Sequence, residues 1–429
     1  MNILLLGSGG REHALAHSLQ QGKHCSNLYI APGNPGTAAC GTNIALNILD
    51  FQELAAFCAD KQIGMLVVGP EEPLVKGLRD YLEADGRFKD LIIIGPGAAG
   101  ARLEGSKDFA KAFMVRHGIP TARYRSFQEE DLHEALAYID SMPAPFVLKA
   151  SGLAAGKGVL ILENAEEAKN EASLILKGKF GDAGKTLVIE EFLDGIECSV
   201  FALTDGTYYM MLPEAKDYKR IGEGDTGLNT GGMGAVSPVP FYSDALDRQV
   251  KEQIIGPTIM GLKQEGIPYQ GFIFFGLMIS NGAPYVIEYN CRLGDPETEV
   301  VIPRIRNDLS ELLLAAGTGR LNQLELETDK RVALTVVSVS EGYPGTFQKG
   351  YEIFGLDAVQ GSKIYQAGTR EEDGHLLTNG GRVLACTSFG DNIGQAATAA
   401  YAALSRICYN GIYFRRDIGA DLVYPEAEL

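Results

Sequence analysis

The chain has 429 residues, a hydrophobic content of 45% and a formal charge of −17. Its length predicts three or four lobes, which together can bury a large core. The acidity disfavours nucleic acid and membrane surfaces as partners, because both carry negative charge. We therefore expect small-molecule ligands, with any phosphate held by a local cluster of donors.

The cysteines and the N-terminus bear on where the protein works. The seven cysteines contain no Cys-x-x-Cys pair and lie far apart, so they predict neither a disulfide framework nor a zinc site. No basic region precedes the first short apolar run, and no apolar stretch approaches about 20 residues. We expect a cytoplasmic protein with reduced, mostly buried thiols and no secretion signal or membrane span.

Short apolar runs alternate with helical patterns from residue 1 to about 97, which predicts a doubly wound βαβαβαβ lobe with a parallel sheet. One of its helices is expected over PLVKGLRDYLEAD, at 73–85. Ser106 is expected to cap a further helix that runs from Lys107 to about His117 and ends at Gly118. A second lobe therefore begins near residue 106.

The rest of the chain predicts three further units. Residues 120–192 contain two strands around a Gly-rich bend, which predicts a hairpin within a small lid lobe. Strand patterns between 198 and 292 predict a largely antiparallel sheet, interrupted by a loop at 216–234. Two strand patterns and an Ala-rich helix predict a small C-terminal α/β lobe. The expected domains are 1–105, 106–328 and 329–429.

The first glycine-rich turn, Gly7-Ser8-Gly9-Gly10-Arg11-Glu12, lies between the first strand and the first helix. Backbone N–H groups and the helix dipole favour a phosphate at this place. A dinucleotide fingerprint would have glycine or alanine at position 12 and an acidic residue closing the second strand, where Glu12 and Pro32 stand. The turn is therefore interpreted as a phosphate site or a simple tight turn, and not as an NAD site.

The second glycine-rich segment, Gly152 to Gly158, resembles a P-loop but is one residue short and has Gly158 where Ser or Thr should bind metal. The flanking strands favour a flap whose N–H groups close over a triphosphate, with Lys149 reaching a phosphate. A plain structural hairpin is the alternative.

Two further segments indicate that the phosphate ligand is ATP. The run from Glu190 to Leu193 follows an apolar strand and is typical of a hinge that offers backbone groups to an adenine edge. Glu197 can accept hydrogen bonds from ribose hydroxyls. Each has a simpler reading, as a strand end and as a solvated carboxylate, so the prediction depends on their combination.

The segment VIEYNCR predicts a metal site. Its alternation places Glu288, Asn290 and Arg292 on one strand face, opposite Ile287, Tyr289 and Cys291. Mg²⁺ takes one or two protein oxygens and completes its shell with water and phosphate. The following turn adds Asp295 and Glu297, which favours a metal and substrate site over a solvated strand face.

A pair of histidines, His13 and His17, lies one helical turn apart and could chelate a metal. No Glu follows His13 and no third ligand is evident in the sequence. We therefore favour an ordinary position on the helix surface.

Taken in order, nine segments closely resemble the glycinamide ribonucleotide synthetase (phosphoribosylamine-glycine ligase) family over almost the whole chain: GGREHA, PGNPGT, VGPEEPLVKG, LEGSKDFAK, GLAAGKGV, IEEFLDG, DTGLNTGGMGA, EYNCRLGDPETE and TNGGR. The resemblance implies an ATP-grasp fold of the α/β class, with two lobes that clasp ATP. It implies that ATP, glycine and 5-phosphoribosylamine give glycinamide ribonucleotide, ADP and phosphate through glycyl phosphate, in de novo purine synthesis.

Matching motifs imply the site residues. ATP would be held by Lys107, Lys149, Gly152, Gly156, Lys157, Gly158, Glu190, Glu191, Phe192, Leu193 and Glu197, and Mg²⁺, or Mn²⁺ in its place, by Glu288 and Asn290. Phosphoribosylamine would be held by Gly9, Gly10, Arg11, Asn34, Gly36 and Thr37. Glycine or its acyl phosphate would be oriented by Arg292, Asp295, Asp225, Asn229, Gly231 and Gly232. Arg292, Asp295 and Lys149 are the expected catalytic residues.

The chain departs from the family pattern at two places. Ser151 stands where the family usually has Asp, and can still cap a helix or bond locally. Gln366 stands where the family usually has His. The chain ends soon after such a ligase would end, so no fused downstream purine enzyme is expected. We expect a monomer or a weak homodimer.

Three other functions are compatible with parts of the sequence. Another ATP-grasp ligase, with a different carboxylate or amine, is disfavoured by the GDPETE turn and the DTGLNTGGMG loop. A dehydrogenase is disfavoured by Glu12 and Pro32, and would leave the metal face at Glu288 without a purpose. An ATP sensor would bind the nucleotide without turnover, which an assay can distinguish.

Overall fold

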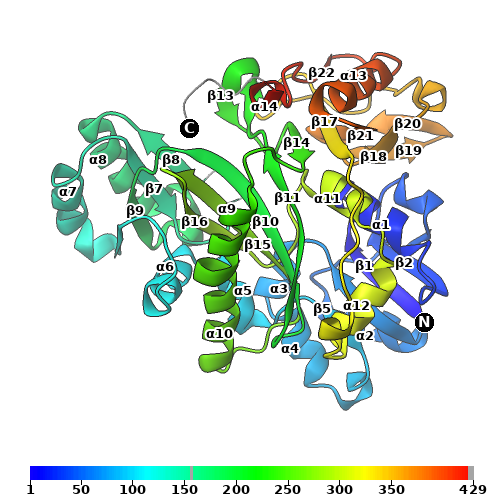
Figure 1. Cartoon of the computed structure of the whole chain (residues 1–429), viewed down its shortest axis with the longest axis horizontal. Helices are drawn as coiled ribbons and strands as arrows, with labels where there is room; N and C mark the ends of the chain where they lie inside the picture. The colour runs from blue at the N-terminus through cyan, green and yellow to red at the C-terminus, as the bar shows by residue number, and fades with distance from the viewer. Residues whose placement is uncertain (155–157, 424–429) are drawn as a thin grey trace.

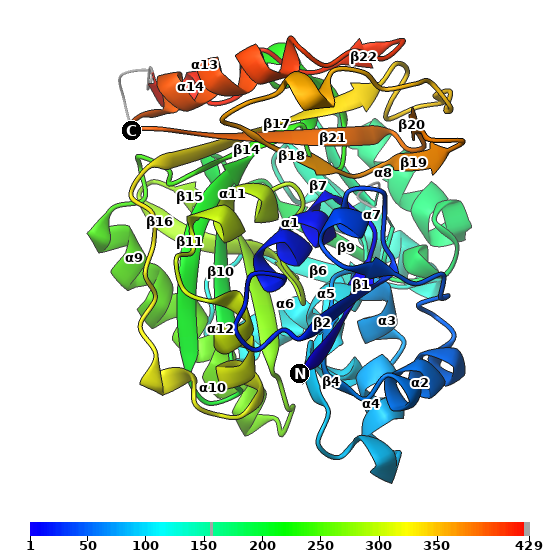
Figure 2. The same cartoon turned by 90° about the vertical axis from the view of Figure 1, so that its right-hand side faces the viewer.

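The protein's structure, a computed structural model, describes residues 1–154 and 158–423 (Figure 1). An N-terminal lobe and a lid lie on opposite sides of a long central sheet, and the last part of the chain covers one end (Figures 1 and 2). This arrangement agrees with the predicted multi-lobe α/β fold. No described helix is long and apolar enough to cross a membrane, and the seven cysteines are free and mostly buried.

The N-terminal lobe contains five parallel strands in the order β3-β2-β1-β4-β5. They are β1 (Asn2–Gly7), β2 (Asn27–Pro32), β3 (Thr42–Asn43), β4 (Ile63–Val68) and β5 (Ile92–Ile94). Because side chains alternate along a strand, Leu4 and Leu6 pack into one core cluster and Ile3 and Leu5 into another. The sheet is therefore buried on both faces, as parallel sheets require.

Helices cover both faces of this sheet. They are α1 (Gly10–Leu19), α2 (Phe51–Asp60), α3 (Glu71–Val75), α4 (Leu78–Glu83) and α5 (Ala98–Gly105), with α11 (Thr298–Arg304) and α12 (Leu309–Gly317) added from the central part. The prediction of a single helix at 73–85 is wrong. Gly77 has a φ of 82°, in the left-handed region that favours glycine, and divides it into α3 and α4.

The lid is a four-stranded antiparallel sheet in the order β6-β9-β7-β8. Its elements are β6 (Tyr124–Phe127), β7 (Phe146–Ala150), β8 (Val159–Leu162), β9 (Leu187–Glu191), α7 (Leu132–Asp140) and α8 (Ala165–Leu174). The predicted hairpin around the Gly-rich bend is confirmed by the pairing of β7 with β8. Helix α6 (Lys107–Arg116) leads into the lid, and the Ser106 hydroxyl accepts from the Phe109 N–H as predicted.

The central antiparallel sheet continues into the C-terminal lobe, so that nine strands form one sheet. They are β16 (Ala283–Asn290), β15 (Gly271–Ser280), β10 (Ile196–Thr204), β11 (Tyr209–Asp217), β14 (Gly234–Ser237), β17 (Val332–Ser340), β21 (Arg382–Gly390), β18 (Lys363–Gln366) and β22 (Ile412–Tyr413). Strand β14 pairs with both β11 and β17, so it joins the two parts. Helix α13 (Ile393–Leu404) packs on β21 and β17.

The segment expected as a loop at 216–234 has structure of its own. It contains a hairpin of β12 (Arg220–Gly222) and β13 (Thr226–Asn229), and it then enters β14. The hairpin lies beside the C-terminal helix α14 (Ala420–Val423) in Figure 1. Its residues 226–229 are exposed.

Candidate active site

Two buried lysines converge on one carboxylate where the lid meets the central sheet. The Glu190 carboxylate on β9 lies 3.0 Å from Lys149 Nζ on β7 and 2.8 Å from Lys111 Nζ on α6. Lys149 also donates to the Ile287 carbonyl on β16, at 3.0 Å. Burial lowers the pKa of Lys111 to about 8, although Glu190 opposes the shift. The cluster carries a net positive charge and joins three elements, which suits a site for phosphate.

Lys107 lies on the same side of the site. Its Nζ donates to the Gly152 carbonyl at 3.3 Å. Burial lowers the pKa of Lys107, and the charge of Glu288 opposes that effect. Ser151 bonds locally as expected, because its hydroxyl accepts from the Asp108 N–H at the start of α6. Gly152 and Gly158 flank the flap, whereas the predicted Gly156 and Lys157 lie outside the described residues.

The predicted adenine hinge connects the lid to the central sheet. Strand β9 ends at Glu191, and Phe192 and Leu193 precede β10. The two glutamates have different partners. Glu190 pairs with Lys111 and Lys149, and Glu191 binds the Arg123 guanidinium at 2.6 Å. Phe192 is exposed. The backbone contact of this connection with adenine stays a prediction.

The metal face of β16 carries an irregularity that the sequence pattern missed. Gly276 on β15 faces Glu288, whereas its neighbour Leu277 faces Val286, so Ile287 forms a β-bulge. A Cβ at Gly276 would lie 2.8 Å from Glu288 Cγ and 3.5 Å from Ile287 Cγ1. The expected place of Ile287 on the opposite face is therefore wrong. Val286 joins Tyr289 and Cys291 in the core instead.

The donors of Glu288 and Asn290 suit a divalent cation. Both side chains are half-buried, and within residues 1–154 and 158–423 neither has a hydrogen-bond or ion-pair partner. The same described residues contain no group of three or more His, Cys, Asp or Glu that could hold a metal. Two protein oxygens therefore fit Mg²⁺ only where nucleotide phosphates and water complete its shell.

Lys219 is a cation of this centre that the sequence analysis missed. Its Nζ lies 2.6 Å from Glu197 Oε2 and 3.9 Å from Asp217 Oδ2. Burial alone would lower the pKa of Lys219, but Asp217, Glu197 and Glu288 together raise it. Burial raises the pKa of Asp217 to about 8. Glu197, predicted to bind ribose, is thus an ion-pair partner of Lys219 in this structure.

Arg292 is held by carboxylates of the N-terminal lobe. Its Nη2 lies 2.7 Å from Glu104 Oε1, and its Nε lies 3.3 Å from Glu71 Oε2. Glu104 also accepts from the Cys291 N–H at 2.8 Å. The guanidinium is thereby fixed at the junction of the N-terminal lobe and the central sheet.

The first glycine-rich turn wraps around Glu12. The Glu12 carboxylate accepts from the Gly9 N–H at 2.7 Å and from Arg11 Nε at 2.6 Å. A Cβ at Gly7 would lie 2.5 Å from Glu12 Cδ, so the glycine is needed for this close approach. The Gly9 N–H is thus taken by Glu12, as in a simple tight turn, and Arg11 is the cation at the turn.

A cavity of about 420 Å³ opens beside this turn. It is lined by Gly7, Ser8, Gly9, Arg11, Glu12, Pro32, Leu46, Asn47, Ile48, Pro70 and Asp295. Asp295 therefore lies with the residues predicted for phosphoribosylamine, and not only with those predicted for glycine. A Cβ at Gly9 would lie 3.3 Å from Asp295 Oδ2, while Gly10 is packed against the buried carboxylate of Glu299.

The predicted residues at 34–37 shape the neighbouring loop. The Asn34 amide donates to the Ser8 and Gln366 carbonyls, and Asn34 Oδ1 accepts from the Gly36 and Thr37 N–H groups. Thr37 is fully buried. These side chains are satisfied within the protein, so they support the cavity wall rather than offer free groups.

His13 is buried, contrary to its expected place on the helix surface. Its Nδ1 accepts from the Gln366 N–H at 2.8 Å, which joins the N-terminal lobe to β18. A Cβ at Gly36 would lie 2.2 Å from the His13 ring, so Gly36 leaves room for it. Gln366, the departure from the family pattern, thus lies at the junction between the lobes.

We expect His13 to make folding stability depend on pH. Burial lowers the pKa of His13 to about 4, from 6.5 in the unfolded chain. Its contribution is complete above pH 6.5 and is lost as the pH falls towards 4, by up to about 3 kcal/mol. Urea unfolding between pH 7.5 and 5 should show a smaller loss for His13→Gln than for the parent. The exposed His133→Gln is the control, and an equal pH slope in all three proteins would contradict the assignment.

The predicted glycine loop divides into two parts. Gly232 lies against Asp295 and Pro296, because a Cβ there would lie 2.2 Å from Pro296 Cδ, and the Gly231 carbonyl shares the donor Arg382 Nη1 with Asp295. Asp225 instead binds Arg415 of the C-terminal part at 2.6 Å, and Asn229 is exposed on the hairpin. The structure therefore brings Gly231 and Gly232 to the site but does not bring Asp225 and Asn229 there.

Comparison with known proteins decides the family. Models of phosphoribosylglycinamide synthetase match the chain at residues 1–104 (N domain), 105–298 (ATP-grasp domain) and 333–421 (C domain). This chain belongs to the phosphoribosylglycinamide synthetase family. A relative named phosphoribosylamine–glycine ligase, from Pasteurella multocida, is 46% identical over 99% of both chains.

Solved structures agree with this family. The crystal structure of phosphoribosylamine–glycine ligase from Thermotoga maritima has a TM-score of 0.84 and 36% identity, and covers 97% of this chain and 100% of its own. The biotin carboxylase domain of a 2-oxoglutarate carboxylase from Hydrogenobacter thermophilus has a TM-score of 0.72 at 16% identity, covering 96% of this chain and 91% of its own. This second likeness extends to the fold alone.

Proposed function

We propose that this chain uses ATP to ligate glycine to 5-phosphoribosylamine, giving glycinamide ribonucleotide, ADP and phosphate. One observation carries the proposal: the side-chain oxygens of Glu288 and Asn290, which have no partner among the described residues, lie in the same centre as Lys107 and Lys149. Family membership over nearly the whole chain supports the same substrates.

The chemistry explains why such a centre is needed. A carboxylate is a poor electrophile, so glycine first takes the γ-phosphoryl group and becomes glycyl phosphate. The ribosyl amine then attacks the acyl carbon, and phosphate leaves. When bound, Mg²⁺ would supply charge neutralisation on the phosphates, held by Glu288 and Asn290, and Mn²⁺ could take its place.

The chain's own residues supply charge and orientation. Lys107 and Lys149 would offset the phosphate charge, with Lys149 held in place by Glu190. Arg292, fixed by Glu71 and Glu104, would orient the glycyl group. Arg11 and Asp295 would hold phosphoribosylamine in the 420 Å³ cavity, whose wall includes Gly9. No side-chain nucleophile is required, because the intermediate forms on the substrate itself.

The organisation we propose follows the sequence expectation. The domains are 1–105, 106–328 with a lid at about 120–192, and 329–429, although one sheet spans the last two. We further propose a cytoplasmic monomer or weak homodimer. Size-exclusion chromatography with light scattering tests the oligomeric state.

Lys219 should contribute to the same centre. We expect Lys219→Met to lower kcat by about 10²-fold, because it removes a cation that faces Glu197, Asp217 and Glu288. Steady-state kinetics would measure the loss, with the exposed Lys263→Met as a matched control. A kcat within threefold of the parent would place Lys219 outside the reacting centre.

The decisive experiment measures ADP release from Mg-ATP with glycine and freshly generated phosphoribosylamine, added singly and together, alongside mass detection of glycinamide ribonucleotide. Equal amounts of ADP and product, formed only when both substrates are present, would establish the ligase. ATP binding without product would leave the fold intact and assign a different substrate pair or a sensor role.

A further inference from the structure

Arg382, at the start of β21, reaches from the C-terminal part into the active site. Its Nη1 donates to the Gly231 carbonyl at 2.7 Å, to Asp295 Oδ1 at 2.7 Å and to the Asp295 carbonyl at 3.1 Å. One guanidinium nitrogen therefore joins the glycine turn to the carboxylate that lines the 420 Å³ cavity.

Tyr343 holds the same turn from a second side. Its hydroxyl accepts from the Gly231 N–H at 2.9 Å. The ring lies against Gly381, where a Cβ would come within 2.1 Å of Tyr343 Cδ2. A Cβ at Gly231 would lie 3.1 Å from Arg382 Cζ. Gly381 of TNGGR and Gly231 of TGG thus leave room for the Tyr343 ring and the Arg382 guanidinium.

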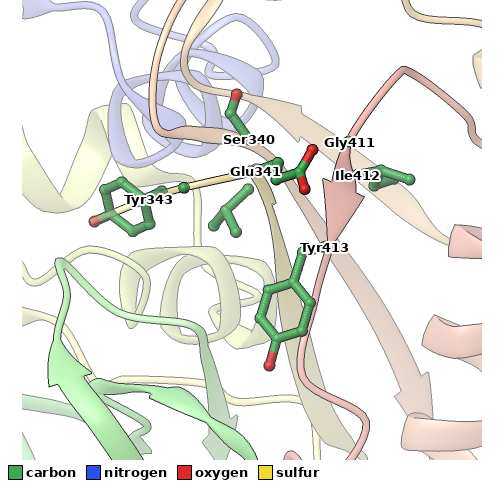
Figure 3. Close-up of a pocket in the computed structure, with 8 residues that line it drawn as sticks. Ser340, Glu341, Tyr343, Gly411, Ile412 and Tyr413 are labelled. Carbon is green, nitrogen blue, oxygen red and sulfur yellow. The ribbon is translucent and has the colours of Figure 1, made fainter. Parts of the chain in front are cut away.

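The C-terminal part also holds the 216–234 segment at Ile221. Tyr413 donates from its hydroxyl to the Ile221 carbonyl at 3.0 Å. Tyr343 and Tyr413 belong to different strands or turns and line one open pocket of about 330 Å³, with Glu341 between them (Figure 3). C-terminal tyrosines therefore hold the segment at Ile221 and at Gly231, and the Gly231 contact lies beside Asp295.

The bonds of Asp295 show what this fixation does. Its Oδ1 is bound by Arg382, and its Oδ2 lies on the side of Gly9, 3.3 Å from where a Cβ would stand. A carboxylate held through one oxygen presents the other in a defined direction. The direction here is towards the cavity wall formed by Gly9 and Arg11.

We infer that Arg382 and Tyr343 are positioning residues for the amine substrate: they lock the Gly231–Gly232 turn against Asp295 and so aim Asp295 Oδ2 at the substrate's amine. The inference rests on the proposed function. It gives the C-terminal part a specific task in the ligation step, and it leaves nucleotide binding to the lid and central sheet.

Kinetics of Arg382→Met, Arg382→Lys and Tyr343→Phe test the inference. For Arg382→Met we expect kcat/KM for phosphoribosylamine to fall about 10²-fold, since misplacing a catalytic group by about 1 Å has this effect. KM for ATP and the Kd of Mg-ATP should stay within threefold of the parent. Arg382→Lys, which keeps a charge and one donor nitrogen, should recover about tenfold of the loss.

Matched controls separate positioning from folding. Arg331→Met removes an arginine of the C-terminal part that pairs with Asp329, and Tyr351→Phe removes an exposed hydroxyl bonded to Gln348. Both should behave as the parent. Equal losses for ATP and phosphoribosylamine together with a lower Tm, or no loss in any variant, would overturn the inference. A parent that makes no glycinamide ribonucleotide would instead overturn the proposed function.

Discussion

Replacing Glu288 by Ala should lower kcat by at least about 10²–10³-fold, the usual cost of losing one group that stabilises charge in the transition state. Glu288 has no protein partner among the described residues and lies in the field of Lys107 and Lys219. Its carboxylate is therefore available to a cation. Removing it takes away one of the two protein oxygens proposed to bind Mg²⁺.

The test needs a measurement that reports on metal binding. Besides kcat, the concentration of Mg²⁺ required for half-maximal activity should rise in Glu288→Ala, and the Mg²⁺ dependence of ATP binding should weaken. Glu252→Ala is the control. It removes an exposed glutamate to which no role in the proposed site is given, and it should match the parent. Turnover within a few-fold of the parent, with an unchanged Mg²⁺ requirement, would remove Glu288 from the site.

Features that depend on local sequence were predictable. The cap at Ser106, the apolar strand β1 of the parallel sheet and the hairpin of β7 with β8 each follow from residues close together in the chain. The same reasoning placed Glu288 and Asn290 on one face of a strand, and the structure agrees.

Features that depend on distant partners were not predictable. The bulge at Ile287 arises from pairing with β15, and a period-2 pattern contains no sign of an extra residue. Glu12 was read as a departure from a fingerprint, whereas it fills the glycine turn and takes the Gly9 N–H. The short strand β14 lacks a pattern long enough to recognise, and it is what makes the central and C-terminal strands one sheet.

The site residues that were not predicted from the sequence also depend on distant partners. Lys111, Lys219, Glu104 and Arg382 were given no role of their own, although three of them lie in the segments LEGSKDFAK and TNGGR, and each becomes significant only through its partner in the folded chain. A signal existed for one of them. Arg382 closes TNGGR, where two successive glycines before an arginine indicate a close backbone approach.

The second large effect is expected at Glu190. This carboxylate is 2% exposed and lies between two buried lysines, Lys111 and Lys149. Glu190→Gln would leave both ammonium groups without their counter-ion, and breaking a buried ion pair in this way costs about 3–5 kcal/mol of unfolding free energy. The affinity for ATP should fall as well, because Lys149 loses the partner that holds it. Urea unfolding and equilibrium binding at pH 7 measure the two effects.

A second substitution distinguishes the effect of uncompensated charge on stability from the effect on ATP binding in the cluster of Glu190, Lys111 and Lys149. Lys111→Met in the Glu190→Gln background removes one of the uncompensated charges, so much of the lost stability should return. ATP affinity should not return with it, because Lys149 still lacks its carboxylate. Recovery of both quantities together would mean that Glu190 acts only through folding. Recovery of neither would mean that burial of two like charges is not the cause, and that the hydrogen bonds of Glu190 carry the stability.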